Sequence, residues 1–335
     1  LVSFLRRRED CLEAGTKYLV LGALSTGFLV YGITWIFGVT GHTNLAAIAA
    51  ALPGLDHAVV PALLFGFGLV LVALSFKVAA APFQFWVPDV YQGAPTPVTA
   101  FLSVASKAAG FVILLRVLQT FVVVPELQDR IIPLVAILAG ATMIFGNLAA
   151  IPQSNLKRLL AYSSIAHAGY LLVGVASIGA PFAGSAILFY LAAYLLMTML
   201  AFLVMIIVAQ AAGGDELSDF AGLSQRAPHL AFAMLLAMLS LAGLPLTVGF
   251  LGKLFIFESA VAQQHYVLAG LGVVTVAAGF YYYLKVVRAM YWQQQADPDA
   301  PEIEVGALAK FTIAALCALI IWLGVYPGPL LALLR

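Results

Sequence analysis

Apolar runs of about 20 residues recur along the whole chain, and none of them shows a polar face. A helix of about 20 apolar residues is long enough to cross the hydrocarbon core of a bilayer. Of the 335 residues, 63% are apolar and 9% are charged, whereas soluble domains carry about 25% charged residues. We therefore predict an all-α integral membrane protein, built as a polytopic helical bundle. A soluble protein with a large core is excluded, because its helices would need polar faces.

The apolar runs predict about nine membrane-spanning segments in a single membrane domain, residues 1–335. The segments cover approximately 13–38, 59–81, 96–122, 131–151, 157–178, 182–211, 228–260, 266–292 and 305–333. Pro82 and Pro88 interrupt the second segment at its end. Gly243 and Pro245 interrupt the seventh. Because proline breaks helices and freed backbone groups need protein or water around them in a bilayer, we expect two discontinuous helices beside a polar path.

Lysine and arginine gather in the short loops on one side of the predicted bundle, which we name the basic side. These residues are Arg6, Arg7, Arg8, Lys17, Lys157, Arg158, Arg226, Lys285, Arg288 and Lys310. The loop at 38–56 on the opposite side has neither lysine nor arginine. Positive loops stay in the cytoplasm, or in the matrix or stroma of an organelle. We expect a multi-pass protein of the bacterial inner (plasma) membrane, with its basic side cytoplasmic. The apolar start before Arg6 resembles the end of a membrane helix, so we also expect helices upstream of Leu1.

Charge and cysteine content exclude several other classes of protein. A net charge of +1 gives no electrostatic case for nucleic-acid binding. Cys11 and Cys317 lie far apart and offer neither a metal-ligand spacing nor an iron–sulfur ligand set. We therefore expect no cofactor and no redox centre in this chain, and any coupled redox chemistry in other subunits.

Three lysines, Lys77, Lys107 and Lys253, lie inside long apolar stretches. A charge at the bilayer centre costs about 2.5–3.5 kcal/mol on the insertion scale, so such lysines are expected to face the protein interior and to serve a function. Burial disfavours the charged form of an amine, which can then load and release a proton. Two structural alternatives remain open. Lys77 and Lys107 could snorkel to the interface, and Lys253 could only pin free backbone carbonyls.

Further candidates for the proton path carry weaker signals. Glu13 precedes Lys17 by four residues, the favourable order for a helical ion pair, so either an interfacial salt bridge or proton delivery is open. His167 in the fifth segment could relay protons or be a hydrogen-bonded core residue. Tyr162, with two serines after it, could hold a water chain one turn away. Asp89 follows Pro88, and we expect it to order a loop.

Three blocks of sequence together resemble one family. They are 76–98 (FKVAAAPFQFWVPDVYQGAPTPV), 155–167 (NLKRLLAYSSIAH), which follows Gly146-Asn147, and 241–253 (LAGLPLTVGFLGK). The chain resembles subunit N, an antiporter-like membrane subunit of proton-pumping NADH:quinone oxidoreductase (respiratory complex I). The resemblance covers nearly the whole chain. It implies inverted five-helix repeats, each with one discontinuous helix.

The resemblance also implies roles for single residues. Lys77 and Lys253 match the lysines of the two discontinuous helices, and Lys107 matches the lysine that links the two half-channels. Glu13 and Lys17 match a Glu–Lys pair. The family's charge partner of Lys77, a glutamate one helix earlier, would lie upstream of Leu1. One departure is Gln84, where many relatives have a histidine.

The expected function is proton translocation driven by quinone reduction elsewhere. NADH, FMN, iron–sulfur clusters and quinone are then expected in partner subunits, and the partners are the other membrane subunits and the lipid bilayer. Two alternatives remain: a subunit of a secondary cation/proton antiporter, and a passive membrane scaffold. Sodium sites normally use carboxylates and carbonyls, of which the predicted membrane interior offers few acids. A scaffold leaves three intramembrane lysines unexplained.

Overall fold

The computed structural model describes residues 1–4, 8–293 and 303–334, and its architecture is an all-helical bundle. The longer helices are α1 (Glu9–Thr40), α3 (Val60–Val78), α6 (Lys107–Phe121), α7 (Pro125–Ala150), α8 (Leu156–Ala176), α9 (Ala183–Ala212), α11 (Pro228–Ala242), α12 (Val248–Ala262), α13 (Tyr266–Trp292) and α14 (Ala307–Val325). The shorter ones are α2 (Leu45–Ala51), α4 (Trp86–Gly93), α5 (Thr96–Phe101), α10 (Leu223–Arg226) and α15 (Gly328–Leu333). Short 3₁₀ turns cover Leu52–Gly54, His57–Val59 and Leu217–Phe220.

Eight helical stretches in the described ranges are long and apolar enough to cross a membrane. The seventh predicted segment is α11 followed by α12, each of 15 residues. The third is α5 and α6 joined by a π-helical turn, Leu102–Ser106, which ends immediately before Lys107. The all-helical membrane fold is confirmed, whereas the number and bounds of the spans stay a prediction.

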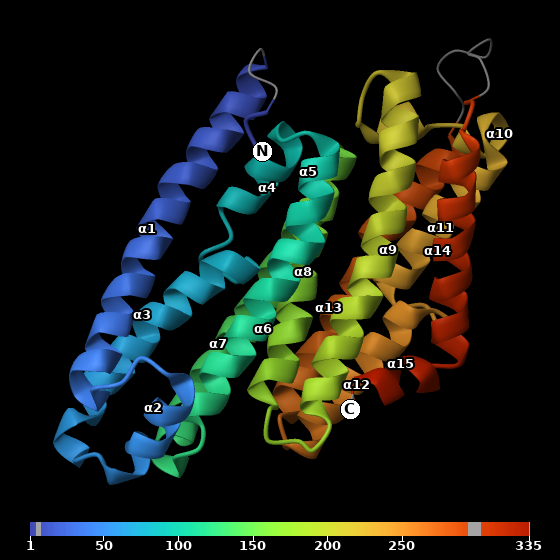
Figure 1. Cartoon of the computed structure of the whole chain (residues 1–335). Coiled ribbons are helices and arrows are strands. Elements are labelled where there is room, and N and C mark those ends of the chain that lie inside the picture. The colour runs from blue at the N-terminus through green and yellow to red at the C-terminus, as the bar shows by residue number, and fades with distance from the viewer. Residues whose placement is uncertain (5–7, 294–302, 335) are drawn as a thin grey trace.

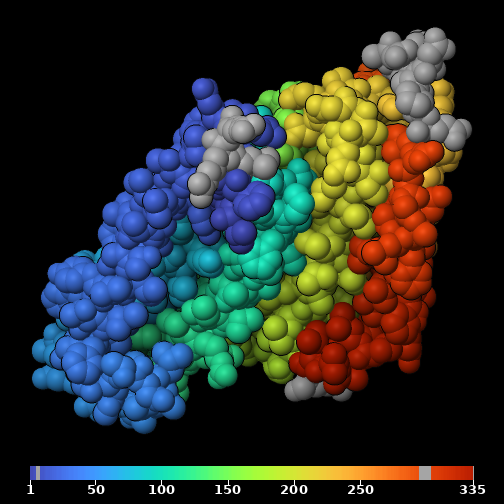
Figure 2. Space-filling view, turned by 45° about the horizontal axis from the view of Figure 1, so that its top comes forward, coloured from blue at the N-terminus to red at the C-terminus, as the bar shows by residue number. Residues whose placement is uncertain are grey.

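Helix α8 is the centre of the bundle. Within each spanning helix, an apolar stretch of 18 residues can be compared for burial. In α8, 94% of that stretch is buried inside the protein, against 11% in α1 and 22% in α14. Figure 1 shows α1 at one side and α14 at the other, and Figure 2 shows them as the blue and red flanks. Helix α12, which carries Lys253, packs directly on α8, and α1, which carries Glu13 and Lys17, packs on α4 beside α8.

Two glycines let α7 lie close against α8. A methyl group added to Gly146 would come within 2.4 Å of the Ala166 backbone nitrogen. One added to Gly169 would come within 2.6 Å of the Met143 backbone nitrogen. Atoms cannot approach this closely, so both positions need glycine at this helix separation.

The first break separates α3 from α4. Ala79 has φ 67°, a left-handed conformation that ends α3, and its N–H donates to the Phe76 carbonyl at 3.2 Å. The Trp86 indole donates to the same carbonyl at 3.0 Å. The Ala81 N–H donates to the Thr142 hydroxyl at 2.9 Å. The freed backbone groups are thus satisfied inside the protein, as a bilayer requires.

The second break separates α11 from α12 at Gly243, whose φ is 92°. The Gly243 N–H donates to the carbonyls of Leu239 and Ser240, both at 3.0 Å. Beyond the break, the Gly249 N–H donates to the Ser240 hydroxyl at 3.3 Å. In Figure 1, α3 and α12 lie in the lower half of the bundle and α4 and α11 in the upper half, so both breaks lie at mid-height. The prediction of two discontinuous helices is confirmed.

Two details differ from the sequence expectations. Helix α1 begins at Glu9, four residues before the predicted segment, so the Glu13–Lys17 pair spans its second and third turns. Asp89, expected in a loop, lies in the helix α4. Proline is tolerated in a first helical turn, where its missing N–H has no intrahelical partner, so Pro88 does not prevent α4 from forming.

Candidate functional site

Lys107 at the start of α6 is buried, with 2% of its surface exposed. Its amine donates to both the backbone carbonyl and the hydroxyl of Ser164 in α8. It also lies over the ring of Tyr194 in α9, 5.5 Å from the ring centre. The same group of side chains includes a Ser103–Tyr194 hydroxyl pair at 2.9 Å and a Tyr91–Ser164 pair at 3.3 Å. None of these partners is a carboxylate, so the amine is held by neutral groups.

His167 lies in the middle of α8 and is 1% exposed. Its Nδ1 is 2.6 Å from the Tyr190 hydroxyl. Its Nε2 is 3.0 Å from the Tyr283 hydroxyl, which also bonds the Ser163 hydroxyl. Both ring nitrogens of the imidazole therefore have hydroxyl partners. Since a neutral imidazole has one donor and one acceptor nitrogen, this geometry suits proton transfer through the ring.

Lys253 in α12 is 5% exposed and reaches back across the second break. Its amine donates to the Leu241 carbonyl at 2.8 Å and to the Ala242 carbonyl at 2.9 Å. These are the last carbonyls of α11, where the helix dipole favours a cation. The amine also lies over the Tyr170 ring, 5.1 Å from its centre. Lys253 therefore caps a helix end, as one of the sequence alternatives supposed.

Lys77, in the last turn of α3, is half-buried. It lines a largely apolar cavity of about 810 Å³ between α1, α3 and α6. Its aliphatic stem packs on Gly110 of α6, where an added methyl would come 3.1 Å from the Lys77 Cγ. No residue in the described ranges forms a salt bridge with it.

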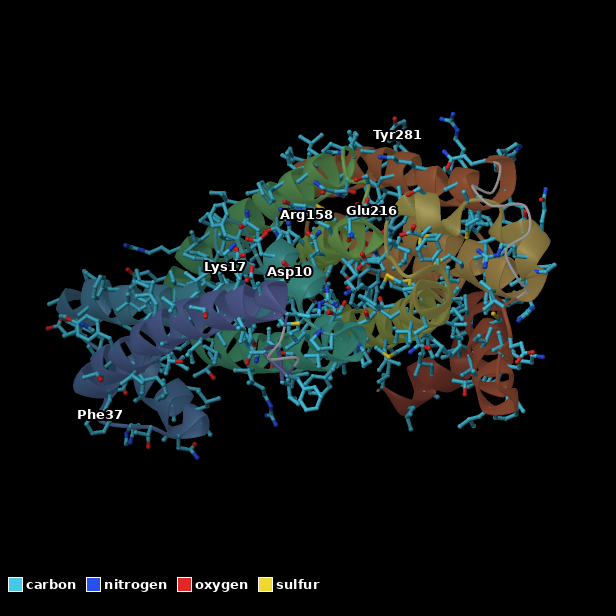
Figure 3. The ribbon with its side chains drawn as sticks, turned by 90° about the horizontal axis from the view of Figure 1, so that it is seen from above. Asp10, Lys17, Phe37, Arg158, Glu216 and Tyr281 are labelled. Atoms are coloured by element: carbon cyan, nitrogen blue, oxygen red, sulfur yellow. The ribbon has the colours of Figure 1, made fainter. Side chains whose placement is uncertain are left out.

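Charged side chains at the upper, basic end of the bundle form a network that we name the basic-side network. Lys17 contacts Glu13 at 2.6 Å and Asp89 at 2.7 Å, and Arg158 contacts Asp89 at 2.9 Å. Figure 3 looks onto this end and shows Lys17 and Arg158 close together. Burial raises the pKa of Asp89, but the hydrogen bonds and charges of Lys17 and Arg158 outweigh it and lower the pKa below its ordinary value. Asp89 thus joins α1, α4 and α8 as a carboxylate.

An ion pair between buried Lys157 and half-buried Asp215 continues this network toward the loop after α9. The Lys157 amine is 3.3 Å from the Asp215 carboxylate, and its side chain is 7% exposed. The same amine is 3.4 Å from the Gln92 and Ala94 carbonyls at the end of α4. Lys157, at the beginning of α8, therefore holds the end of α4 in place.

The structure brings some of the sequence candidates together and separates others. Lys107, His167 and Lys253 all line the centre of the bundle around α8, whereas Glu13 and Lys17 lie at its basic end. Tyr162 is half-buried and lies beside Phe145 and the Arg158 guanidinium rather than in the hydrogen bonds of His167. Gln84 is buried at the first break, and its Oε1 has no hydrogen-bond partner among the described residues.

Sequence reasoning missed four tyrosines, Tyr91, Tyr190, Tyr194 and Tyr283. All four are buried, and each hydroxyl bonds a serine or His167. Their only signal in the sequence is a hydroxyl in an apolar helix, which is a common feature of membrane proteins. Among the residues that the structure describes, no group of three or more His, Cys, Asp or Glu side chains is placed to hold a metal ion.

Residues 1–279 match the family model described as "NADH:quinone oxidoreductase/Mrp antiporter, TM". The chain belongs to this family. It is 43% identical over 331 residues to NADH-quinone oxidoreductase subunit N of Desulforamulus reducens, covering 98% of this chain and 68% of that one. It is 44% identical to subunit N of Heliobacterium modesticaldum over 333 residues, covering 98% and 68% of the two chains. The resemblance inferred from the sequence blocks is confirmed.

Solved structures give the same family. A chain of respiratory complex I from Thermus thermophilus with bound aureothin aligns with a TM-score of 0.82 and 39% identity, over 98% of this chain and 70% of that one. A chain of an archaeal membrane-bound sulfane sulfur reductase aligns with a TM-score of 0.91 and 27% identity, over 100% and 66% of the two chains. A chain of the Mrp complex from Dietzia, at 24% identity and a TM-score of 0.86, shares the fold.

Proposed function

We propose that this chain is a proton-translocating membrane subunit of an NADH:quinone oxidoreductase, with Lys77, Lys107 and Lys253 as its proton-carrying groups. The relatives named NADH-quinone oxidoreductase subunit N support the assignment to that complex. The other membrane subunits of such a complex are then its partners. In this proposal the side chains of this chain supply proton-transfer groups. NADH, FMN, iron–sulfur clusters and quinone belong to partner subunits.

One observation supports the pathway more than any other. Lys107 and Lys253 are buried amines on different helices, and His167 lies between them with hydroxyl partners on both ring nitrogens. The Tyr190 ring packs closely on Gly252 of α12, where an added methyl would come 2.4 Å from the Tyr190 Cδ2. The hydrogen-bonded side chains around His167 are thus in contact with the helix that carries Lys253. Isolated cations at this depth cost free energy and mark proton relays. The linked Ser163, Tyr283, His167 and Tyr190 side chains supply groups that a relay between the two amines can use.

The proposed route begins at the basic side. A proton reaches Lys77, passes through water to Lys107, continues by way of His167, and leaves Lys253 toward the opposite side. Lys77 has no ion-pair partner among the described residues, and a carboxylate supplied beside the cavity would set its affinity for the proton. We place the basic side in the cytoplasm, because the helix ends there carry Lys17, Lys157 and Arg158, whereas the segment between α1 and α3 carries no lysine or arginine.

The energy for transport must come from outside this chain. Moving one charge against 100 mV requires about 2.3 kcal/mol. Quinone reduction in partner subunits would supply it through charge and conformational changes. The two breaks and the π-helical turn before Lys107 are the places where backbone geometry is least regular, and they lie beside the lysines that would respond.

The test is proton pumping by the assembled complex in inverted membrane vesicles with NADH as donor. We expect Lys77→Ala and Lys253→Ala each to reduce the pumping rate sharply, because each removes a proton-carrying amine. Lys310→Ala is the matched control, since Lys310 is an exposed lysine at the beginning of α14. Normal pumping in both of the first two variants would refute the pathway.

A secondary cation/proton antiporter is the second candidate, favoured by the fold shared with the Mrp complex. Cation sites for sodium are built from carboxylates and carbonyls. The buried polar side chains of the described residues include neither aspartate nor glutamate. Cation flux by the protein in vesicles without an electron donor would favour this candidate over the pump.

A further inference from the structure

Tyr282 and Tyr283 are consecutive residues of α13 with equally buried side chains, each 1% exposed. Their side chains also hydrogen-bond each other, but their other partners differ. The Tyr283 hydroxyl contacts the Ser163 hydroxyl and the His167 Nε2, the latter at 3.0 Å. The Tyr282 hydroxyl donates to the Asn147 Oδ1 at 3.1 Å. Consecutive residues of a helix point about 100° apart, which explains why one reaches α8 and the other α7.

We propose that Tyr283 is a proton-relay residue, which passes protons between the Ser163 hydroxyl and the imidazole of His167. The proposal rests on the proposed function, because it assigns a step of the same pathway. Tyr282 takes no part in this step, although it has the same chemistry and burial. The two residues therefore separate a transfer role from a packing role.

The chain of hydrogen bonds from Ser163 through Tyr283 and His167 to Tyr190 can be polarised in either direction. In one direction Ser163 donates to Tyr283, Tyr283 donates to the His167 Nε2, and the protonated Nδ1 donates to Tyr190. In the other direction every donor becomes an acceptor, and the imidazole changes tautomer. Each group in the chain is both a donor and an acceptor, which is the condition for moving a proton without leaving a charge behind.

The atoms balance in one passage. The Ser163 O–H bond breaks as a new O–H bond forms at Tyr283, whose own proton moves to the His167 Nε2. The proton on Nδ1 moves to the Tyr190 oxygen, and the former Tyr190 proton continues through water to the Lys253 amine. The Lys107 ammonium restores the Ser163 proton through the Ser164 hydroxyl and one water molecule. One proton enters and one leaves, and no oxidant or reductant takes part.

Tyr282 does not contact His167 directly among the described residues, and its hydroxyl meets the relay only through that of Tyr283. Asn147 accepts the Tyr282 hydroxyl proton and donates its own Nδ2 hydrogens to the Met143 carbonyl at 2.8 Å and to the Tyr170 hydroxyl at 3.1 Å. An amide does not readily give up a proton and regain it on another atom. This branch therefore links α7, α8 and α13 structurally, and neither Tyr282 nor Asn147 contacts a ring nitrogen of His167.

The test compares Tyr283→Phe with Tyr282→Phe in the assembled complex, in inverted vesicles energised with NADH. Each substitution keeps the ring, and the two ring centres pack 4.4 Å apart in the protein. We expect Tyr283→Phe to lower the rate of NADH-driven proton pumping by at least about tenfold, since a positioned proton-transfer group typically contributes about 10²–10⁴-fold. We expect Tyr282→Phe to pump at the wild-type rate.

Equal pumping by wild-type and Tyr283→Phe complexes, or equal losses in the two tyrosine variants, would overturn the proposal. Lys253→Ala in the same experiment separates this failure from that of the proposed function. Loss of pumping in Lys253→Ala with normal pumping in Tyr283→Phe refutes only the relay, whereas normal pumping in both refutes the pathway.

A variant that does not assemble is replaced by a change on the other side of the same hydrogen bond. Ser163→Ala removes the Tyr283 partner, and we expect a similar loss of pumping. Ser177→Ala is its control, because the buried Ser177 hydroxyl bonds only the Val173 carbonyl, at 2.8 Å, among the described groups. Normal pumping in Ser163→Ala overturns the relay.

Discussion

Lys253 offers a test that separates proton transfer from helix capping. Its amine donates to the Leu241 and Ala242 carbonyls. An alanine substitution would be harmful under either role, so it cannot separate them. Arginine keeps a positive charge and several N–H donors, but it cannot be deprotonated in proteins. Lys253→Arg should therefore preserve the cap and abolish proton release, whereas Lys253→Met should lose both.

The magnitudes follow from the two contacts. A hydrogen bond to a charged group contributes about 1.5–3 kcal/mol, so Lys253→Met loses about 3–6 kcal/mol around the break if the two contributions add. Relaxation of the neighbouring backbone would reduce that figure. Lys253→Arg should retain most of it, since the guanidinium can reach the same carbonyls at the end of α11.

The assay measures two quantities on the same preparation. Thermal unfolding of the purified complex reports stability, and NADH-driven proton uptake in inverted vesicles reports pumping. We expect Lys253→Met to lower both and Lys253→Arg to lower only pumping, by about tenfold or more. A Lys253→Arg complex that pumps at the wild-type rate would show that Lys253 acts only as a cap, and our assignment of it to proton release would be wrong.

Two further predictions concern stability. Because Lys17 and Arg158 lower the pKa of Asp89, its carboxylate stabilises the fold above its unfolded pKa of about 4, and this contribution disappears as the pH falls through the lowered folded value. Thermal unfolding of the complex between neutral and acid pH should therefore show a component that Asp89→Asn removes, and an unchanged pH profile in that variant would contradict this reasoning. Gly146→Ala should push α7 away from α8 and destabilise the complex by about 1–3 kcal/mol. Its control is Gly270→Ala in α13, where nothing lies within 4 Å of the added methyl, and equal melting temperatures for the two alanine variants would argue against the close contact.

The fold could be predicted from the sequence in most respects, because bilayer physics leaves few choices. Long apolar runs must be helices, and the Pro82 and Gly243 regions must break them. The position of the breaks relative to Lys77 and Lys253 followed from sequence order alone. The π-helical turn before Lys107 could not be predicted, since its residues, Leu102–Ser106, carry no helix-breaking signal.

The candidate site was predictable only in part. The lysines stood out because a charge in an apolar run is costly, and His167 because imidazole titrates near neutral pH. Its partners could not be found in this way. Tyr190 and Tyr283 lie 23 and 116 residues away along the chain, and only tertiary packing brings their hydroxyls to the imidazole. Tyr162, chosen because it is near His167 in sequence, lies on another face of α8 beside Arg158.

The burial of α8 on all its faces has a consequence for which substitutions the protein can accept. Nearly every position of this helix touches another helix. Lipid cannot replace a lost contact there, whereas it can around α1 or α14. In a library of random substitutions selected for respiratory growth, acceptable changes should be rare along α8 and common along the outer faces of those two helices. The 21 residues of α8 would thus form the most mutation-sensitive of the spanning helices.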